Sequence, residues 1–284
     1  MTTQSEPGEE HSRLKLVIAY NGQEFSGSQR QPGQRTVQGE LEAALATLAK
    51  REVALSLAGR TDTGVHASGQ VGSCLDPRPD LEAGELQRAL LALLPKDISV
   101  YRVERVSAAF DPRRSAQWRH YRYRIRVGPR NPVDDTAVLC LDGTLNTMRL
   151  LHGALRFEGE HDFGSFAGLG RGTPESADRD KGRGTTRRIL MAHVRSRMDE
   201  GWNGQEIAID IVGDAFLPGQ VRSMVGALLE VGRGNVQPDW IDSLLEIADR
   251  RQGPKSVPAK GLTLVQVGYD EWNEASVPRW PGKA

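Results

Sequence analysis

The chain has 284 residues, enough for one large or two modest domains that fold around a core without disulfides or metal ions. Its 37 basic and 37 acidic residues give a formal net charge of zero, which by itself weighs against nucleic-acid binding. The two cysteines, Cys74 and Cys140, lie far apart, which favours a reducing compartment and argues against a disulfide scaffold.

Strands and helices are predicted to alternate through the first hundred residues. In order, the predicted elements are a strand at 13–20, a helix at 36–50, strands at 53–57 and 69–75, a helix at 81–94 and a strand at 98–106. Thr36 is suited to be the N-cap of the first helix, and Pro95 ends the second helix.

The second half of the chain continues in the same style. In order, the predicted elements are a strand at 119–127, a helix at 147–157, strands at 188–198 and 206–212, helices at 221–232 and 240–250, and a strand at 262–269. Several strands follow one another without an intervening helix. We therefore predict an α+β fold with mainly antiparallel sheets rather than a doubly wound parallel sheet.

The segment 168–188 is rich in glycine and charge, and the sequence GRGT occurs in it twice. This composition predicts a long loop. The loop is either a solvated insertion or a basic arm that becomes ordered on RNA, and the sequence leaves both interpretations open.

Several classes of protein are disfavoured by missing patterns. The sequence contains no dinucleotide or P-loop fingerprint, no paired histidines with zinc spacing and no G-x-S-x-G elbow, so we predict no metal, no nucleotide cofactor and no other cofactor. The acidic N-terminal segment is unlike a signal peptide, and no apolar run approaches the roughly 20 residues of a membrane span. We expect a soluble, cytoplasmic protein without a membrane partner.

Positive charge is concentrated in one region of the chain. Residues 102–130 contain nine arginines and only two acidic residues, Glu104 and Asp111. Strand alternation places a row of basic side chains on one face of the predicted strand, namely His120, Arg122, Arg124 and Arg126. This face is either the solvated side of a half-buried strand or a binding surface for nucleic-acid phosphates, and the lack of a balancing acid favours the second interpretation.

The stretch AGRTDTGVHASGQV, residues 58–71, places Arg60, Asp62 and His66 between glycines. A positioned, ionised carboxylate can attack an electrophilic carbon, and a neighbouring arginine stabilises its charge. The glycines allow a tight turn and close approach of a ligand. Alone, however, the stretch is more typical of a structured turn, with His66 in a structural role.

Taken together, seven stretches in order over residues 13–272 resemble those of the A-type tRNA pseudouridine synthases. They are YNGQEFSGSQRQPGQRTVQGELE, AGRTDTGVHASGQV, ALLPKDISV, FDPRRSAQWRHYRY, DFGSF, DAFLPGQVRSMVGALLEVG and AKGLTLVQVGY. The resemblance implies two ferredoxin- or RRM-like α+β subdomains, at 13–109 and 110–272, with joined sheets and a central catalytic cleft. Residues 1–12 and 273–284 are then flexible tails.

The resemblance also implies an activity and its residues. Uridine would be isomerised to pseudouridine at positions 38, 39 and 40 of the tRNA anticodon stem-loop, after the base is flipped from its stack. Asp62 would be the nucleophile, with Arg60 pairing with it or guiding the flipped nucleotide and with Arg222 near the carboxylate. The residues expected to bind substrate are Tyr121, Phe110, Arg113, Arg114 and Leu264. The expected partners are tRNA and a second copy of the chain, because members of the family are homodimers.

The sequence departs from the family pattern at a few places. Ser28 stands where relatives usually carry tryptophan, which removes packing area, and Pro218-Gly219 replaces bulkier residues before the helix that contains Arg222. Two other functions remain open: a non-catalytic RNA-binding module, and a glycosidase-like enzyme that releases free uracil. The combination of Arg60, Asp62, Tyr121 and Arg222 argues against the first, and a search for free uracil distinguishes the second.

Overall fold

The computed structural model describes residues 13–132, 135–168, 182–199, 201, 204–277 and 280. Its strands form one ten-stranded sheet whose main path runs β4-β1-β3-β10-β5-β9-β8-β7, with β2 paired to β3 and β6 to β5. The strands are β1 (Arg13–Tyr20), β2 (Ser56–Leu57), β3 (His66–Leu75), β4 (Ile98–Val106), β5 (Trp118–Val127), β6 (Leu139–Leu141), β7 (Gly159–Asp162), β8 (Thr186–Asp199), β9 (Gly204–Gly213) and β10 (Leu262–Gly268).

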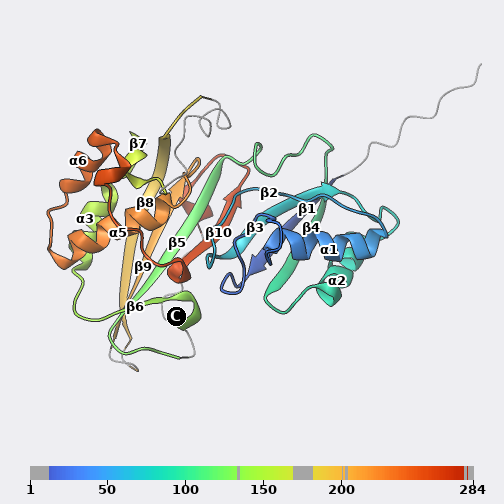
Figure 1. Ribbon diagram of the computed structural model, residues 1–284, viewed down its shortest axis with the longest axis horizontal. Helices are drawn as coiled ribbons and strands as arrows, with labels where there is room; N and C mark the ends of the chain where they lie inside the picture. The colour runs from blue at the N-terminus through green and yellow to red at the C-terminus, as the bar shows by residue number, and fades with distance from the viewer. Residues whose placement is uncertain are drawn as a thin grey trace, which may run out of the picture.

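The longer helices lie in two groups at the two ends of the sheet (Figure 1). One group contains α1 (Val37–Ala49) and α2 (Ala83–Leu93), beside β1 to β4. The other contains α3 (Thr147–Leu155), α5 (Gln220–Arg233) and α6 (Trp240–Ile247), beside β7 to β9. β10 lies between the two groups and joins them, because it pairs in parallel with β3 and antiparallel with β5.

Local chemistry explains several of these elements. Alternate residues of β1 are buried, as expected for a strand that packs one face on a core. Thr36 is the N-cap of α1, where its side chain accepts a hydrogen bond from the amide of Gly39, as predicted. Gly234 ends α5 in the left-handed conformation, with φ of 82°, which glycine adopts without steric cost.

The predicted α+β class with a mainly antiparallel joined sheet is confirmed. The short strands β6 and β7 were not predicted, because they contain only three and four residues. The strand predicted at 53–57 is restricted to Ser56 and Leu57. The division into subdomains at residue 110 stays a prediction.

Two predicted segments lie partly or wholly outside the described residues. Residues 1–12 are outside them, as is most of the predicted loop 168–188. Of the predicted tail at 273–284, residue Val277 is buried in a small cluster with Trp118, Met191 and Val212. In the described ranges, no helix is both long enough and apolar enough to cross a membrane.

Candidate active site

The loop that contains Asp62 joins β2 to β3, and the residue before Asp62 is held by neighbouring segments. The amide of Thr61 donates to Ser28 Oγ at 2.8 Å, and the amide of Ser28 donates to the Thr61 carbonyl at 3.1 Å. The hydroxyls of Thr61 and Tyr20 are hydrogen bonded at 2.8 Å. Burial raises the pKa of the Tyr20 phenol to about 12, so this group stays protonated at neutral pH. Thr61, next to Asp62, is therefore held by two hydrogen bonds to its backbone and one to its side chain.

A close backbone contact supports the other side of the loop. A Cβ atom on Gly22 would lie 2.0 Å from the carbonyl oxygen of Val65, so only glycine permits this approach. Gly64 has a φ of 79°, in the region that glycine favours, and the amide of Val65 donates to the Asp62 carbonyl at 3.1 Å. His66, which follows, is buried, and its Nδ1 accepts a hydrogen bond from the Gly22 amide at 3.2 Å. This bond and its burial agree with the structural role expected for His66.

Asp62 forms an ion pair with an arginine from the other half of the chain. Nη1 of Arg222, in the first turn of α5, lies 3.4 Å from Asp62 Oδ2. The Asp62 side chain is one-third exposed, and Nε of Arg222 donates to the Val257 carbonyl at 2.8 Å. Arg60, the arginine that the sequence analysis placed beside Asp62, is exposed, and its predicted role stays a prediction. The ion pair thus joins the loop after β2 to the first turn of α5.

Tyr121 projects from β5 near the same loop. A Cβ atom on Gly59 would lie 4.0 Å from the Tyr121 hydroxyl oxygen. The Tyr121 side chain is only 8% exposed, its ring centroid lies 5.2 Å from that of Phe216 in an edge-on arrangement, and burial raises the pKa of its phenol. Leu264 is its register partner on β10 and is fully buried. A base could therefore stack on Tyr121 only after a neighbour such as Phe216 moves.

The predicted tRNA-contact segment lies just before β5. Asp111 Oδ1 accepts hydrogen bonds from the amides of Arg113 and Arg114 at 2.9 and 2.8 Å, which leaves both arginine side chains exposed on a fixed turn. The ring of Phe110 packs at 5.1 Å from that of Tyr269. The segment is thus ordered and basic, and its contact with RNA stays a prediction.

The expectation of an unbalanced basic face on β5 is wrong. His120, Arg122 and Arg126 are buried, and acidic residues of β9 neutralise them. Asp210 accepts hydrogen bonds from His120 and Arg122, each at 2.7 Å. The reason is register: β5 and β9 pair so that Arg122 is opposite Asp210 and Arg126 is opposite Glu206. This face is therefore a buried charge network rather than a phosphate-binding surface.

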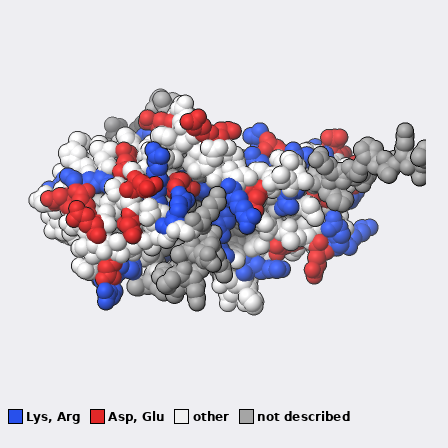
Figure 2. Space-filling model, turned by 90° about the horizontal axis from the view of Figure 1, so that it is seen from above, with Lys and Arg blue, Asp and Glu red and all other residues white. Residues whose placement is uncertain are grey.

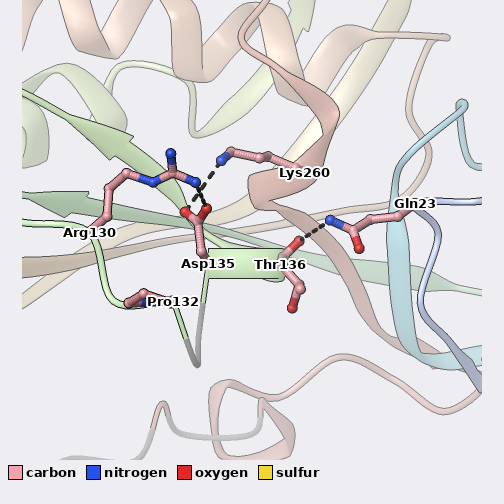
Figure 3. A pocket seen from close by; sticks show the side chains of 6 residues that line it. All are labelled: Gln23, Arg130, Pro132, Asp135, Thr136 and Lys260. Atoms are coloured by element: carbon pink, nitrogen blue, oxygen red, sulfur yellow. Dashed lines mark hydrogen bonds and ion pairs between the residues drawn. The ribbon is translucent and has the colours of Figure 1, made fainter.

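The exposed charges have a different distribution. Figure 2 shows acidic and basic side chains mixed over one face, with basic ones gathered near the middle of the molecule. A depression of about 310 Å³ is lined by Gln23, Arg130, Pro132, Asp135, Thr136 and Lys260 (Figure 3). Asp135 forms ion pairs with Arg130 and Lys260 in this depression. The carboxylate therefore neutralises much of the positive charge of these two side chains. In the described part of the chain, no group of side chains has the composition of a metal site.

Comparisons with known proteins identify the chain's family. A family model described as tRNA pseudouridine synthase matches residues 16–113 and 154–270. The chain belongs to the tRNA pseudouridine synthase family. This membership confirms the predicted enzyme class, an isomerase that forms pseudouridine in tRNA.

Three relatives of the chain are named tRNA pseudouridine synthase A. The one from Geotalea uraniireducens is 36% identical over 258 residues, covering 90% of this chain and 99% of the relative. The one from Maridesulfovibrio salexigens is 37% identical and covers 91% of each chain. The one from Streptomyces avermitilis is 37% identical and covers 95% of this chain and 91% of the relative.

Two residues of this pseudouridine synthase contact the candidate site without having been predicted to do so. Ser28 was treated only as a loss of packing area, although its hydroxyl accepts the hydrogen bond beside Asp62. Phe216 was not singled out, although it packs on Tyr121. Ser28 lies inside a recognised motif, and this position was the signal that could have identified it. The contact of Phe216 depends on a loop 95 residues after Tyr121, so no local sequence signal indicates it.

Proposed function

We propose that the enzyme converts uridine to pseudouridine at positions 38, 39 and 40 of the tRNA anticodon stem-loop, with Asp62 as the nucleophile. The main support is the ion pair between Asp62 and Arg222 at 3.4 Å, on a loop whose backbone is fixed by Ser28 and Tyr20. A carboxylate that is held this way and remains one-third exposed suits attack on an electrophilic carbon. The choice of anticodon positions comes from the resemblance of the motifs.

In the proposed reaction, the target nucleotide leaves its stack and enters the site. Asp62 attacks the nucleoside, the bond between ribose C1′ and uracil N1 breaks, and the uracil turns. C1′ then bonds to uracil C5, C5 loses its proton, N1 gains one, and the carboxylate is released. Substrate and product contain the same atoms, so the reaction needs no oxidant, reductant or water.

The other site residues have supporting roles in this proposal. Arg222 stabilises the ionised carboxylate, and Tyr121 supplies a surface for the uracil once Phe216 moves aside. Arg60 guides the flipped nucleotide, Leu264 forms part of the apolar base pocket, and the segment of Phe110, Arg113 and Arg114 contacts the tRNA backbone. Arginine suits that last role, because its planar fork matches phosphate geometry.

We also propose that the enzyme acts as a homodimer, with tRNA contacting both subunits, in the cytoplasm where its substrate is found. A symmetric dimer doubles the exposed arginine surface, which aids RNA binding by a chain whose net charge is zero. Sedimentation of the enzyme with and without tRNA measures the stoichiometry. A monomer that binds one tRNA would contradict this part of the proposal.

The decisive test compares Asp62→Asn with the parent enzyme on tRNA substrates whose modified positions are mapped. We expect the variant to bind tRNA with unchanged affinity and to form no pseudouridine, because an amide is not a nucleophile of this kind. Asp142→Asn, at an exposed position after β6, is the matched control and should retain full activity. Turnover by Asp62→Asn would overturn the nucleophile assignment, product at other tRNA positions would overturn the choice of positions, and free uracil would indicate hydrolysis.

A further inference from the structure

Arg119 has an unusual set of partners for an arginine beside an active site. Its Nη1 donates to the carbonyl oxygens of Asp214 at 2.6 Å and Ala116 at 3.3 Å. Its Nη2 donates to the carbonyl oxygens of Arg113 at 2.8 Å and Ala58 at 3.4 Å. Burial lowers the pKa of the guanidinium, and the four carbonyl oxygens replace water around its charge.

The four carbonyls belong to the segments that carry the proposed catalytic and binding residues. Ala58 begins the loop of Asp62, and Asp214 begins the loop that leads into α5 and Arg222. Arg113 and Ala116 lie in the proposed tRNA-contact turn, and Arg119 itself is two residues from Tyr121 on β5. One guanidinium therefore joins the Asp62 loop, the loop before α5 and the segment before β5.

The shape of the arginine side chain matters for this arrangement. A guanidinium presents five N–H donors in a rigid plane, whereas a lysine ammonium presents three on one rotating nitrogen. Lysine would keep the positive charge but could not reach four carbonyls in separate segments. The contribution of Arg119 thus depends on its geometry as well as on its charge.

We propose that Arg119 is a positioning residue for pseudouridine formation, which sets the Asp62 loop, the entry to α5 and the tRNA-contact turn in their mutual orientation. The inference rests on the proposed function, because it concerns the same reaction. Within the described residues, all hydrogen bonds of the Arg119 side chain go to backbone carbonyl oxygens. Arg119 therefore acts through the segments that it holds.

The test uses Arg119→Met, which keeps most of the apolar stem, and Arg119→Lys, which keeps the charge. Arg149→Met is the matched control, because Arg149 is also half-buried and donates to backbone carbonyls, those of Val231 at 2.9 Å and Val236 at 2.7 Å, away from the Asp62 loop. For each variant, thermal midpoint, tRNA dissociation constant and single-turnover rate at saturating enzyme are measured. The rate is corrected for the folded fraction.

We expect both Arg119 variants to lose about 100-fold in single-turnover rate, the size of effect that a misplacement of about 1 Å produces, with tRNA affinity within about threefold of the parent. Arg149→Met should lose stability but keep its rate within about twofold. A parental rate for Arg119→Met, full rescue by lysine, or equal rate losses in Arg149→Met would overturn the positioning role. Absence of pseudouridine formation by the parent enzyme itself would instead overturn the proposed function.

Discussion

Asp62 and Arg222 lie 160 positions apart in the chain, yet Nη1 of the arginine is 3.4 Å from the carboxylate. The arginine is itself anchored, since its Nε donates to the Val257 carbonyl and the amide of Val257 donates back to the Arg222 carbonyl. The backbone of Val257 thus holds both the side chain and the main chain of Arg222, the cation beside the proposed nucleophile.

Replacing this cation should slow the chemical step. A hydrogen bond to a charged group contributes about 1.5–3 kcal/mol, so we expect Arg222→Gln to lower the single-turnover rate by about 10- to 150-fold. Arg233→Gln, at the other end of α5 and paired with Glu230 at 3.5 Å, is the control and should keep its rate. Parental rates in both variants would show that the ion pair has no role in the reaction.

Two variants of Tyr121 separate the contribution of the aromatic ring to the rate from that of the hydroxyl. Tyr121→Phe should keep near-parental rates, because stacking needs only the ring. Tyr121→Ala should lose about 5- to 150-fold, the equivalent of the 1–3 kcal/mol that base stacking on an aromatic ring contributes. Rates are compared per folded molecule, since Tyr121 is also part of the core. Equal activity in both variants would contradict the stacking role.

Ser28 should contribute to stability through its hydrogen bond to the Thr61 amide, although its side chain is small. Ser28→Ala leaves the Thr61 amide buried without its acceptor, which costs about 1–3 kcal/mol of unfolding free energy. Ser26→Ala is the control, because Ser26 in the same loop hydrogen bonds to Gln34 at an exposed site. Denaturant titration of the two variants measures the difference, and losses of the same size would show that burial of the bond is unimportant.

Acid should weaken the buried network around Asp210. Burial by itself raises the pKa of this carboxyl, but the hydrogen bond and charge of His120 and the charge of Arg122 outweigh burial and hold the pKa below its usual value. The stabilisation is therefore fully present above the unfolded-state pKa of about 3.9 and is lost as pH falls through the lower folded-state value.

Unfolding free energy measured from pH 7 to pH 2 tests this expectation. The parent should lose stability below about pH 4, and part of that slope should vanish in Asp210→Asn. The variant should also be less stable at pH 7 by about 3–5 kcal/mol, because it leaves buried cations without their partner. An unchanged acid slope in the variant would show that Asp210 does not titrate as inferred.

A substitution at Gly22 tests its close contact with Val65, in the loop that contains Asp62. In Gly22→Ala the new methyl group would meet the Val65 carbonyl at 2.0 Å, so the loop must shift. We expect a loss of about 1–3 kcal/mol in stability together with a lower rate per folded molecule. Gly84→Ala in α2 is the control, since its methyl group would lie 3.9 Å from the nearest side chain and alanine favours helix. Wild-type behaviour of Gly22→Ala would contradict the contact.

Local patterns in the sequence were sufficient for most elements. The N-cap at Thr36 and the strand at 13–20 depend on neighbouring residues, and both are found where predicted. The loop of Asp62 was likewise recognised from its motif. Motif resemblance also singled out Arg222, whose approach to Asp62 no local pattern could give.

The errors arose where strands far apart in sequence determine the environment. Whether Arg122 is solvated depends on Asp210, which lies opposite it only because of the β5–β9 register. The role of Ser28 depends on a loop 33 residues away, and the packing of Phe216 on Tyr121 depends on one 95 residues away. Alternation predicts the two faces of a strand but not what covers them.

The position of β10 has a consequence for biosynthesis. The sheet passes from its first half to its second through this strand, which contains residues 262–268 near the end of the chain. Because a ribosome delivers the N-terminal half first, Asp62 is synthesised long before the strand that brings its loop beside the second half. The two halves of the sheet therefore cannot be joined as in this structure until residues 262–268 have been synthesised.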